Sequence, residues 1–227
     1  MPTPINTIYQ YVIDYFSEHN PNAASELHYQ NPFQLLVAVV LSAQCTDKRV
    51  NMITPPLFAQ YPTPEAMSKA TVEEIFQFIK SVSYPNNKAK HLSGLAKMLV
   101  DKFEGVMPQN RKDLESLPGV GRKSANVILS ICFDQPTMAV DTHVFRVANR
   151  IGLVQNAKTP FEVEQQLTAH FPEEIIPLAH HWLILHGRYV CLARKPQCEK
   201  CGLTEVCGYF QRLDTNGMVR KGKNKKK

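Results

Sequence analysis

Four cysteines lie close together near the end of this chain: Cys191, Cys198, Cys201 and Cys207, with six, two and five residues between successive thiols. Four thiols in one short segment can hold a metal centre, which would tie that segment together. Structural zinc sites usually have two Cys-x2-Cys pairs, and only Cys198–Cys201 forms one here. The ferredoxin spacing does not match either. The residues alone therefore leave zinc and an iron–sulfur cluster open.

The composition indicates a compact, largely helical protein. The chain has 227 residues, is 44% hydrophobic and contains only 10 glycines, which is enough to bury a substantial core. Its longest strongly apolar run, Leu35 to Leu41, is too short to cross a bilayer, and the first residues lack the pattern of a signal peptide. We therefore expect a cytoplasmic protein without a membrane partner, whose cysteines are reduced or bind metal.

Helix signals recur along the chain. N-cap residues followed by proline, by glutamate three positions on, or by both occur at Asn31-Pro32, Thr63-Pro64, Thr71 with Glu74, and Thr159-Pro160 with Glu162. The run from Leu35 to Leu41 has the periodicity of either a buried strand or a buried helix, and the cap before it favours the helix. No stretch alternates like a strand between hairpin turns. The predicted fold class is all-α.

A tight hairpin separates two predicted helices at Leu117-Pro118-Gly119-Val120-Gly121-Arg122-Lys123. Its glycines permit positive φ and a close approach of the backbone. The turn leaves unpaired amide N–H groups at the positive end of the second helix, where a phosphate can bind without its base being read. Most Gly-x-Gly turns are only turns, but the whole string is far more specific.

The net charge of +6 suits a polyanionic partner without identifying it. Much of the excess lies in residues 215–227, which contain five nearly contiguous lysines. We interpret this segment as a disordered, solubilising tail in preference to a dedicated binding arm, and either would attract nucleic acid loosely.

Three further strings extend the pattern: Leu41-Ser42-Ala43-Gln44, Ala139-Val140-Asp141-Thr142-His143, and His181-Trp182-Leu183-Ile184-Leu185-His186-Gly187-Arg188. With the hairpin and the four cysteines, they resemble the helix-hairpin-helix DNA glycosylases, and closely the endonuclease III branch, over nearly the whole chain. The resemblance implies a bifunctional DNA glycosylase/AP lyase of base excision repair. Such an enzyme would be a monomer at the bacterial nucleoid, acting on double-stranded DNA with damaged bases or abasic sites. Oxidised pyrimidines are the family's expected lesions.

The resemblance assigns catalysis to two side chains. Lys123 would attack the sugar C1′, and burial together with the helix terminus and Arg122 would favour the neutral amine that attack requires. Taken alone, Lys123 reads more simply as a phosphate contact. Asp141 would stabilise positive charge as the glycosidic bond breaks and relay protons. An aspartate in that place is usually a helix N-cap, and the two roles are compatible.

Two residues are expected to enter the duplex when the damaged nucleotide is flipped out. By resemblance, Gln44 inserts toward the orphaned partner base, and the loop containing Tyr84 supplies a second wedge. The family pattern in that loop is Gly, then Leu or Phe, then Tyr, whereas this chain has Ser83-Tyr84-Pro85. Tyr84 can stack on exposed bases or pack against the following helix, and its sequence leaves both open.

The resemblance also settles the predicted metal and the phosphate contacts. The six-two-five spacing matches the family's 4Fe–4S site, with a structural duty. The cluster would shape the loop that presents Arg194 and Lys195 to DNA. The hairpin contacts would come from Gly119, Val120, Gly121 and Arg122. Cys45 and Cys132 are read as buried apolar thiols.

The family's two-lobed fold predicts a helix-hairpin-helix lobe at residues 25–135. The cluster lobe would combine residues 1–24 with 136–214. Two rival interpretations are a monofunctional glycosylase of the same superfamily and a non-enzymatic DNA-binding redox sensor. Lys123 and the absence of a large domain after Cys207 argue against the first, and the Lys123–Asp141 pair argues against the second.

Overall fold

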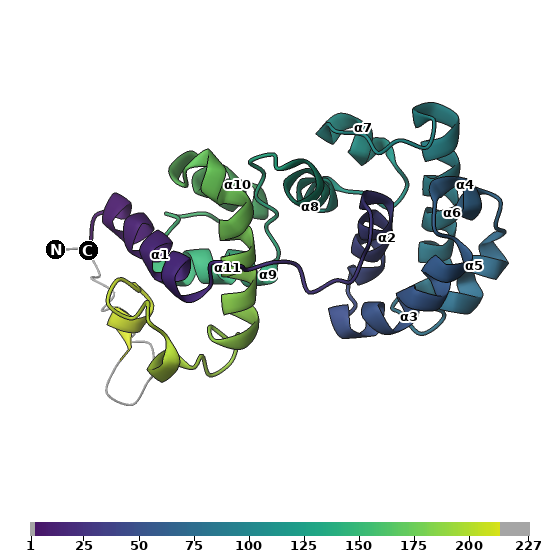
Figure 1. Ribbon diagram of the computed structural model, residues 1–227. Helices are drawn as coiled ribbons and strands as arrows, with labels where there is room; N and C mark the ends of the chain where they lie inside the picture. The colour runs from purple at the N-terminus through teal and green to yellow at the C-terminus, as the bar shows by residue number, and fades with distance from the viewer. Residues whose placement is uncertain (1–2, 214–227) are drawn as a thin grey trace, which may run out of the picture. The chain divides into compact units, whose positions relative to one another are not determined.

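A computed structural model describes residues 3–213, and the basic tail predicted at 215–227 lies outside this range. The described residues form helices and connecting loops without a β-strand (Figure 1). The all-α prediction is therefore confirmed. No helix in this range is both long and apolar enough to span a bilayer.

The chain divides into two compact units, Ser25–Ala139 and a second unit that joins Met1–Ala24 to Val140–Lys227. The helices of the first unit are α2 (Pro32–Ser42), α3 (Asp47–Gln60), α4 (Pro64–Ser68), α5 (Val72–Ile79), α6 (Pro85–Phe103), α7 (Arg111–Ser116) and α8 (Arg122–Phe133). The second contains α1 (Ile5–His19), α9 (Thr142–Ile151), α10 (Pro160–His170), α11 (Ile176–Tyr189) and the 3₁₀ turns η1 (Glu173–Ile175), η2 (Cys198–Lys200) and η3 (Phe210–Arg212). Their assignment as a hairpin lobe and a cluster lobe stays a prediction.

Helix α2 forms the centre of the 25–139 unit. Every residue from Phe33 to Leu41 is buried, and the helix packs against α3, α6 and α8. Its start follows the predicted signature, because the Asn31 side chain accepts a hydrogen bond from the backbone N–H of Gln34 at 2.9 Å, and Pro32 occupies the first turn. The interpretation of this apolar run as a buried helix is confirmed.

The other predicted helix starts are also observed. Thr63 caps α4, and Thr71 and Thr159 each form a complete capping box with the glutamate three residues on. In α6, Leu92, Leu95 and Leu99 lie on the buried face, as their spacing predicts. Local signals therefore account for where most of these helices begin.

Helix α1 joins the C-terminal half of the chain. Its apolar face buries Ile8, Val12 and Phe16, and the Phe16 ring stacks on the fully buried Trp182 of α11 with a centroid distance of 5.6 Å. The indole Nε1 of Trp182 donates to the Asn20 carbonyl at 2.8 Å, which satisfies its polar edge. The N-terminal helix is thus part of the unit that holds the four cysteines.

Candidate active site and metal centre

The hairpin between α7 and α8 uses its two glycines differently. Gly119 has a φ of 81°, and a Cβ there would lie 2.9 Å from the Cβ of His91, so both conformation and packing call for glycine. Gly121 is the extended N-cap of α8 (φ −103°, ψ 179°), and a Cβ there would meet no atom within 4 Å. Only Gly119 therefore uses the positive φ that the sequence permits at both. The open space beside Gly121 leaves room for a ligand.

The start of α8 can receive an anion. Its N-cap is Gly121, so no N-cap side chain accepts a hydrogen bond from the first turn. Val120 is buried and can offer only its backbone to a ligand, whereas Gly121 and Arg122 are exposed. The uncapped amides and the positive end of the helix dipole together form a site that suits phosphate.

Lys123 lies at the second position of α8 and its side chain is exposed. The expectation that the protein itself buries this amine is wrong for the described chain, because a residue in the first turn of α8 has not yet entered the core that Ala125 and Ile128 fill. Any desolvation of the amine must come from what binds to it. The amine is correspondingly accessible to a substrate.

Asp141 is the N-cap of α9. Its Oδ1 accepts hydrogen bonds from the backbone N–H groups of His143 and Val144, each at 2.8 Å. Oδ2 accepts none from residues 3–213, and the side chain is half-buried. The carboxylate is therefore held rigidly by one oxygen while the other remains available. Lys123 belongs to the 25–139 unit and Asp141 to the other, so their pairing stays a prediction.

Gln44 and Tyr84 lie in two loops of the 25–139 unit that are joined to each other. The Ser83 hydroxyl donates to the Gln44 carbonyl at 2.6 Å. Gln44 and Tyr84 both have left-handed backbones, with φ of 53° and 55°, a conformation that costs a residue other than glycine about 1–2 kcal/mol. Both side chains are exposed, Tyr84 by 65%, so the interpretation of Tyr84 as packed against the next helix is wrong. Such a conformation persists only where the surrounding contacts hold it, and here it accompanies two side chains that extend into solvent.

The four cysteines predicted as metal ligands line a single cavity, together with His186, Pro196 and Leu203. The cavity holds about 350 Å³ of space not filled by atoms, part of it open to solvent, and all four thiols are free. Within the described part of the chain, no three His, Cys, Asp or Glu side chains are grouped so as to hold one metal ion. Four thiols that line one cavity are a donor set suited to zinc or to an iron–sulfur cluster.

Burial shapes the chemistry of these thiols. It raises the pKa of Cys201 to about 11 and also raises the pKa of Cys198 and Cys207. Because metal binds the thiolate, binding has to displace these protons. Cys45 and Cys132, outside this set, pack against the core of the 25–139 unit, but they are only partly buried where the sequence predicted buried thiols.

Arg150 of α9 anchors the cysteine segment, a role that sequence reasoning missed. Its guanidinium donates to the Leu192 carbonyl at 2.7 Å, to the Ala193 carbonyl at 2.9 Å and to Cys191 Sγ at 3.4 Å. The same group lies over the Tyr209 ring, 4.7 Å from its centroid. The next residues, Arg194 and Lys195, are exposed, so the anchored loop presents both to solvent as expected.

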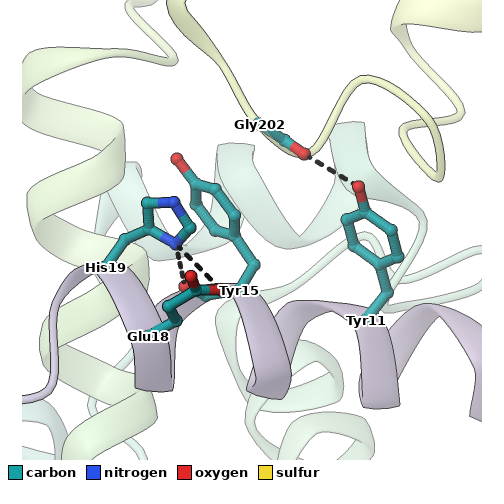
Figure 2. A network of polar contacts seen from close by, with 5 residues as sticks. All are labelled: Tyr11, Tyr15, Glu18, His19 and Gly202. Atoms are coloured by element: carbon teal, nitrogen blue, oxygen red, sulfur yellow. Dashed lines mark hydrogen bonds and ion pairs between the residues drawn. The ribbon is translucent and has the colours of Figure 1, made fainter.

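Helix α1 supports the same segment from another side. Tyr11 donates through its hydroxyl to the Gly202 carbonyl at 3.2 Å, and the Tyr15 ring lies beside Gly202 (Figure 2). The Tyr15 ring is held in turn by stacking on His19, with centroids 4.4 Å apart. A Cβ at Gly202 would overlap the Tyr15 ring. This glycine is thus a packing requirement between Cys201 and Cys207, and no local sequence signal indicated it.

We expect Gly202→Ala to lower the free energy of unfolding by about 1–3 kcal/mol, because the added methyl must displace a held ring. Chemical unfolding followed by circular dichroism measures this, and the iron content of the purified variant and wild-type proteins tests the predicted metal site. Gly208→Ala is the matched control next to another cysteine, since its Cβ would lie 3.6 Å from the nearest atom. Equal stability and iron content in the two variants would contradict this account of the packing.

Comparison with known proteins agrees with this geometry. Residues 37–173 match the family model described as HhH-GPD superfamily base excision DNA repair protein. The chain is 50% identical to Endonuclease III of Rickettsia conorii over 202 residues, which cover 89% of this chain and 96% of the relative. It is 45% identical to Endonuclease III of Escherichia coli K12 over 197 residues, covering 87% and 93%.

A solved structure also matches closely. It is titled as a trapped Endonuclease III–DNA covalent intermediate, an estranged-adenine complex, with a TM-score of 0.85 and 43% identity over 91% of this chain and 97% of that one. The chain thus belongs to the HhH-GPD superfamily of base excision DNA repair proteins. Within that superfamily its family is endonuclease III, whose members are DNA glycosylases with AP lyase activity.

Proposed function

We propose that this chain excises damaged bases from double-stranded DNA and then cleaves the strand at the resulting abasic site. The observation that carries the proposal is an accessible amine, Lys123, beside the uncapped amides of α8 and the open Cβ position of Gly121. A phosphate on those amides would place a nucleotide sugar near the amine. The relative trapped covalently on DNA supports a nucleophile of this kind.

Lys123 acts as the nucleophile. Its neutral amine attacks C1′, the C1′–N glycosidic bond breaks, and the base leaves with the bonding electrons and takes up a proton. Opening of the sugar gives an iminium between Lys123 and C1′. The iminium acidifies C2′, so loss of a C2′ proton breaks the C3′–O bond and expels the phosphate. Water then hydrolyses the imine and restores the lysine.

Asp141 stabilises the reaction by its charge. Its Oδ1 is fixed by two backbone amides, and its Oδ2 is left to face positive charge developing at the sugar or to move a proton from the amine. This role requires Asp141 to approach the sugar bound at Lys123, and the rigid cap makes the carboxylate a preorganised group.

The grip on DNA uses backbone amides and exposed cations. Gly119, Val120, Gly121 and Arg122 hold one phosphate at the hairpin. Arg194 and Lys195 are exposed on a loop that Arg150 anchors, and contact further phosphates. Gln44 and Tyr84 enter the space left by the flipped nucleotide, because both project from strained, exposed loops.

We expect Tyr84→Ala to slow base excision from duplex DNA by about tenfold, since stacking of a base on an aromatic ring is worth about 1–3 kcal/mol. Tyr84→Phe keeps the ring and should retain nearly full activity. Single-turnover excision on one lesion-containing duplex measures both. A large loss in Tyr84→Phe would point to the hydroxyl and contradict the stacking role.

Cys191, Cys198, Cys201 and Cys207 would hold a 4Fe–4S cluster. The support is the shared cavity that all four thiols line, together with the family to which the chain belongs. When bound, the cluster supplies structural cross-linking, and the lyase chemistry exchanges no electrons. Iron and sulfide in the purified protein with a broad visible absorbance would support the cluster, and one zinc per chain would overturn it.

The proposal extends to the setting of the reaction. The substrate is duplex DNA with damaged bases, oxidised pyrimidines first, or abasic sites, and the enzyme works as a monomer on the nucleoid in the cytoplasm. Excision assays on a panel of single-lesion duplexes test the substrate. Sedimentation with and without DNA tests the monomer.

Borohydride reduction on an abasic duplex tests the proposal against its rivals. A bifunctional enzyme forms an imine that borohydride converts into a stable protein–DNA adduct. A monofunctional glycosylase and a non-enzymatic DNA-binding sensor form none. Absence of an adduct with the wild-type protein would overturn the lyase proposal.

A further inference from the structure

Lys88 of α6 is a buried lysine, and no carboxylate of residues 3–213 forms an ion pair with it. Only 5% of its surface is exposed, yet its Nζ donates to the Leu41 carbonyl at 2.9 Å and to the Ala43 carbonyl at 2.7 Å. These carbonyls belong to the C-terminal end of α2, where backbone acceptors lack partners within the helix and the dipole favours a cation. Burial lowers the pKa of Lys88, because the charged ammonium gives up part of its solvation in this position.

The contacts of Lys88 reach both loops that carry the wedge residues. Its side chain holds the carbonyl of Ala43, immediately before Gln44. Its backbone N–H donates to the Tyr84 carbonyl at 3.1 Å. The Ser83 hydroxyl adds a second link, to the Gln44 carbonyl at 2.6 Å. The bond to Tyr84 is the first backbone bond of α6, which any residue at this position would make. The lysine side chain therefore fixes the Gln44 loop directly, and the Tyr84 loop is joined to it through Ser83.

The backbone at Gln44 and Tyr84 needs such support. Left-handed φ values of 53° and 55° are unfavourable for these residue types, so without fixed hydrogen bonds the loops would relax to ordinary conformations. Relaxation would turn the Gln44 and Tyr84 side chains away from their present directions. Neither side chain makes a hydrogen bond within residues 3–213 that could hold it in place.

We propose that Lys88 is a positioning residue for strand opening: it holds Gln44 and Tyr84 as a pair aimed at the duplex, without contacting DNA itself. The inference rests on the proposed glycosylase/AP lyase function. According to this inference, opening of the duplex depends on the buried ammonium of Lys88. The chemistry at Lys123 does not depend on it. Its specific consequence is a defect confined to substrates whose bases are stacked.

The test compares duplex and single-stranded DNA. Lys88→Met keeps the length of the side chain and removes its donors. We expect single-turnover cleavage of an abasic duplex by Lys88→Met to fall by about tenfold or more, since small misplacement of a positioning group has effects of this size. Cleavage of a single-stranded abasic oligonucleotide, which has no stack to open, should change by less than about twofold. A 2-aminopurine base next to the lesion should show less unstacking by fluorescence.

A second comparison separates positioning from general damage to the fold. If Lys88 acts through the two wedges, Lys88→Met should have little further effect in a Gln44→Ala, Tyr84→Ala background. Ser83→Ala removes one link from an accessible loop, so it should produce a smaller defect of the same duplex-only kind even if Lys88→Met fails to fold. Lys90→Met, at an exposed position on the same helix, is the matched control and should act like wild type.

Each outcome decides the inference. The inference would be overturned if Lys88→Met lost equal activity on duplex and single-stranded DNA, or if its effect were fully additive with the wedge substitutions. It would also be overturned if Ser83→Ala cleaved the abasic duplex at the wild-type rate. Failure of the wild-type protein to cleave either substrate would instead refute the proposed function, so the two failures are distinguishable.

Discussion

Lys123→Gln should abolish borohydride trapping and strand cleavage while leaving binding to lesion-containing DNA nearly unchanged. We expect cleavage to fall by roughly a thousandfold or more, because glutamine offers no nucleophile and no imine can form. Stability should change by less than about 0.5 kcal/mol, since Lys123 is exposed in the first turn of α8. Trapping on an abasic duplex and fluorescence anisotropy on a lesion duplex measure the two effects.

Lys195→Gln is the control for loss of a positive charge. Lys195 is exposed on the loop after α11 and is assigned only a phosphate contact. We expect it to keep the covalent adduct and to weaken DNA binding modestly, with less effect as salt rises. A trapped adduct that survives in Lys123→Gln would remove Lys123 from the role of nucleophile.

Asp141→Asn should separate capping from catalysis. Asparagine caps a helix about as well as aspartate, so the two hydrogen bonds to the His143 and Val144 amides can persist and stability should change by no more than about 0.5 kcal/mol. The negative charge is lost, and we expect base excision to slow by roughly a hundredfold or more. Circular dichroism melts and single-turnover excision measure the two effects independently.

Asp141→Ala completes the comparison. It removes the cap as well as the charge, so it should lose a further ~1 kcal/mol of stability with about the same catalytic defect as Asp141→Asn. If Asp141→Asn excised bases at the wild-type rate, Asp141 would be a helix cap and nothing more.

Local chemistry explains what could be predicted from the sequence. The caps at Asn31, Thr63, Thr71 and Thr159 act within four residues, and the structure has each of them. The family resemblance brought the four cysteines together, and they do line one cavity. These features depend on short spacing or on a motif that is already familiar.

The missed residues act across long separations in the sequence. Lys88 donates to carbonyls 45 and 47 residues away in the sequence. Arg150 donates to the Leu192 carbonyl, 42 residues away, and Tyr11 to the Gly202 carbonyl, 191 residues away. From the sequence, a lysine in the helix after Pro85 is expected to be exposed to solvent. No local pattern indicates that the C-terminal end of α2 lies beside it. The exposure of Lys123 was also missed, because a catalytic amine was expected to be buried by the protein itself.

Peptide mapping of the borohydride-reduced adduct tests the central claim most directly. The wild-type protein is trapped on an abasic duplex, the DNA is digested, and mass spectrometry locates the remaining sugar fragment on the protein. We predict the fragment on the Lys123 side chain, which trypsin then fails to cleave. A fragment on another amine, such as Lys88, Lys195 or the N-terminus, would contradict the account.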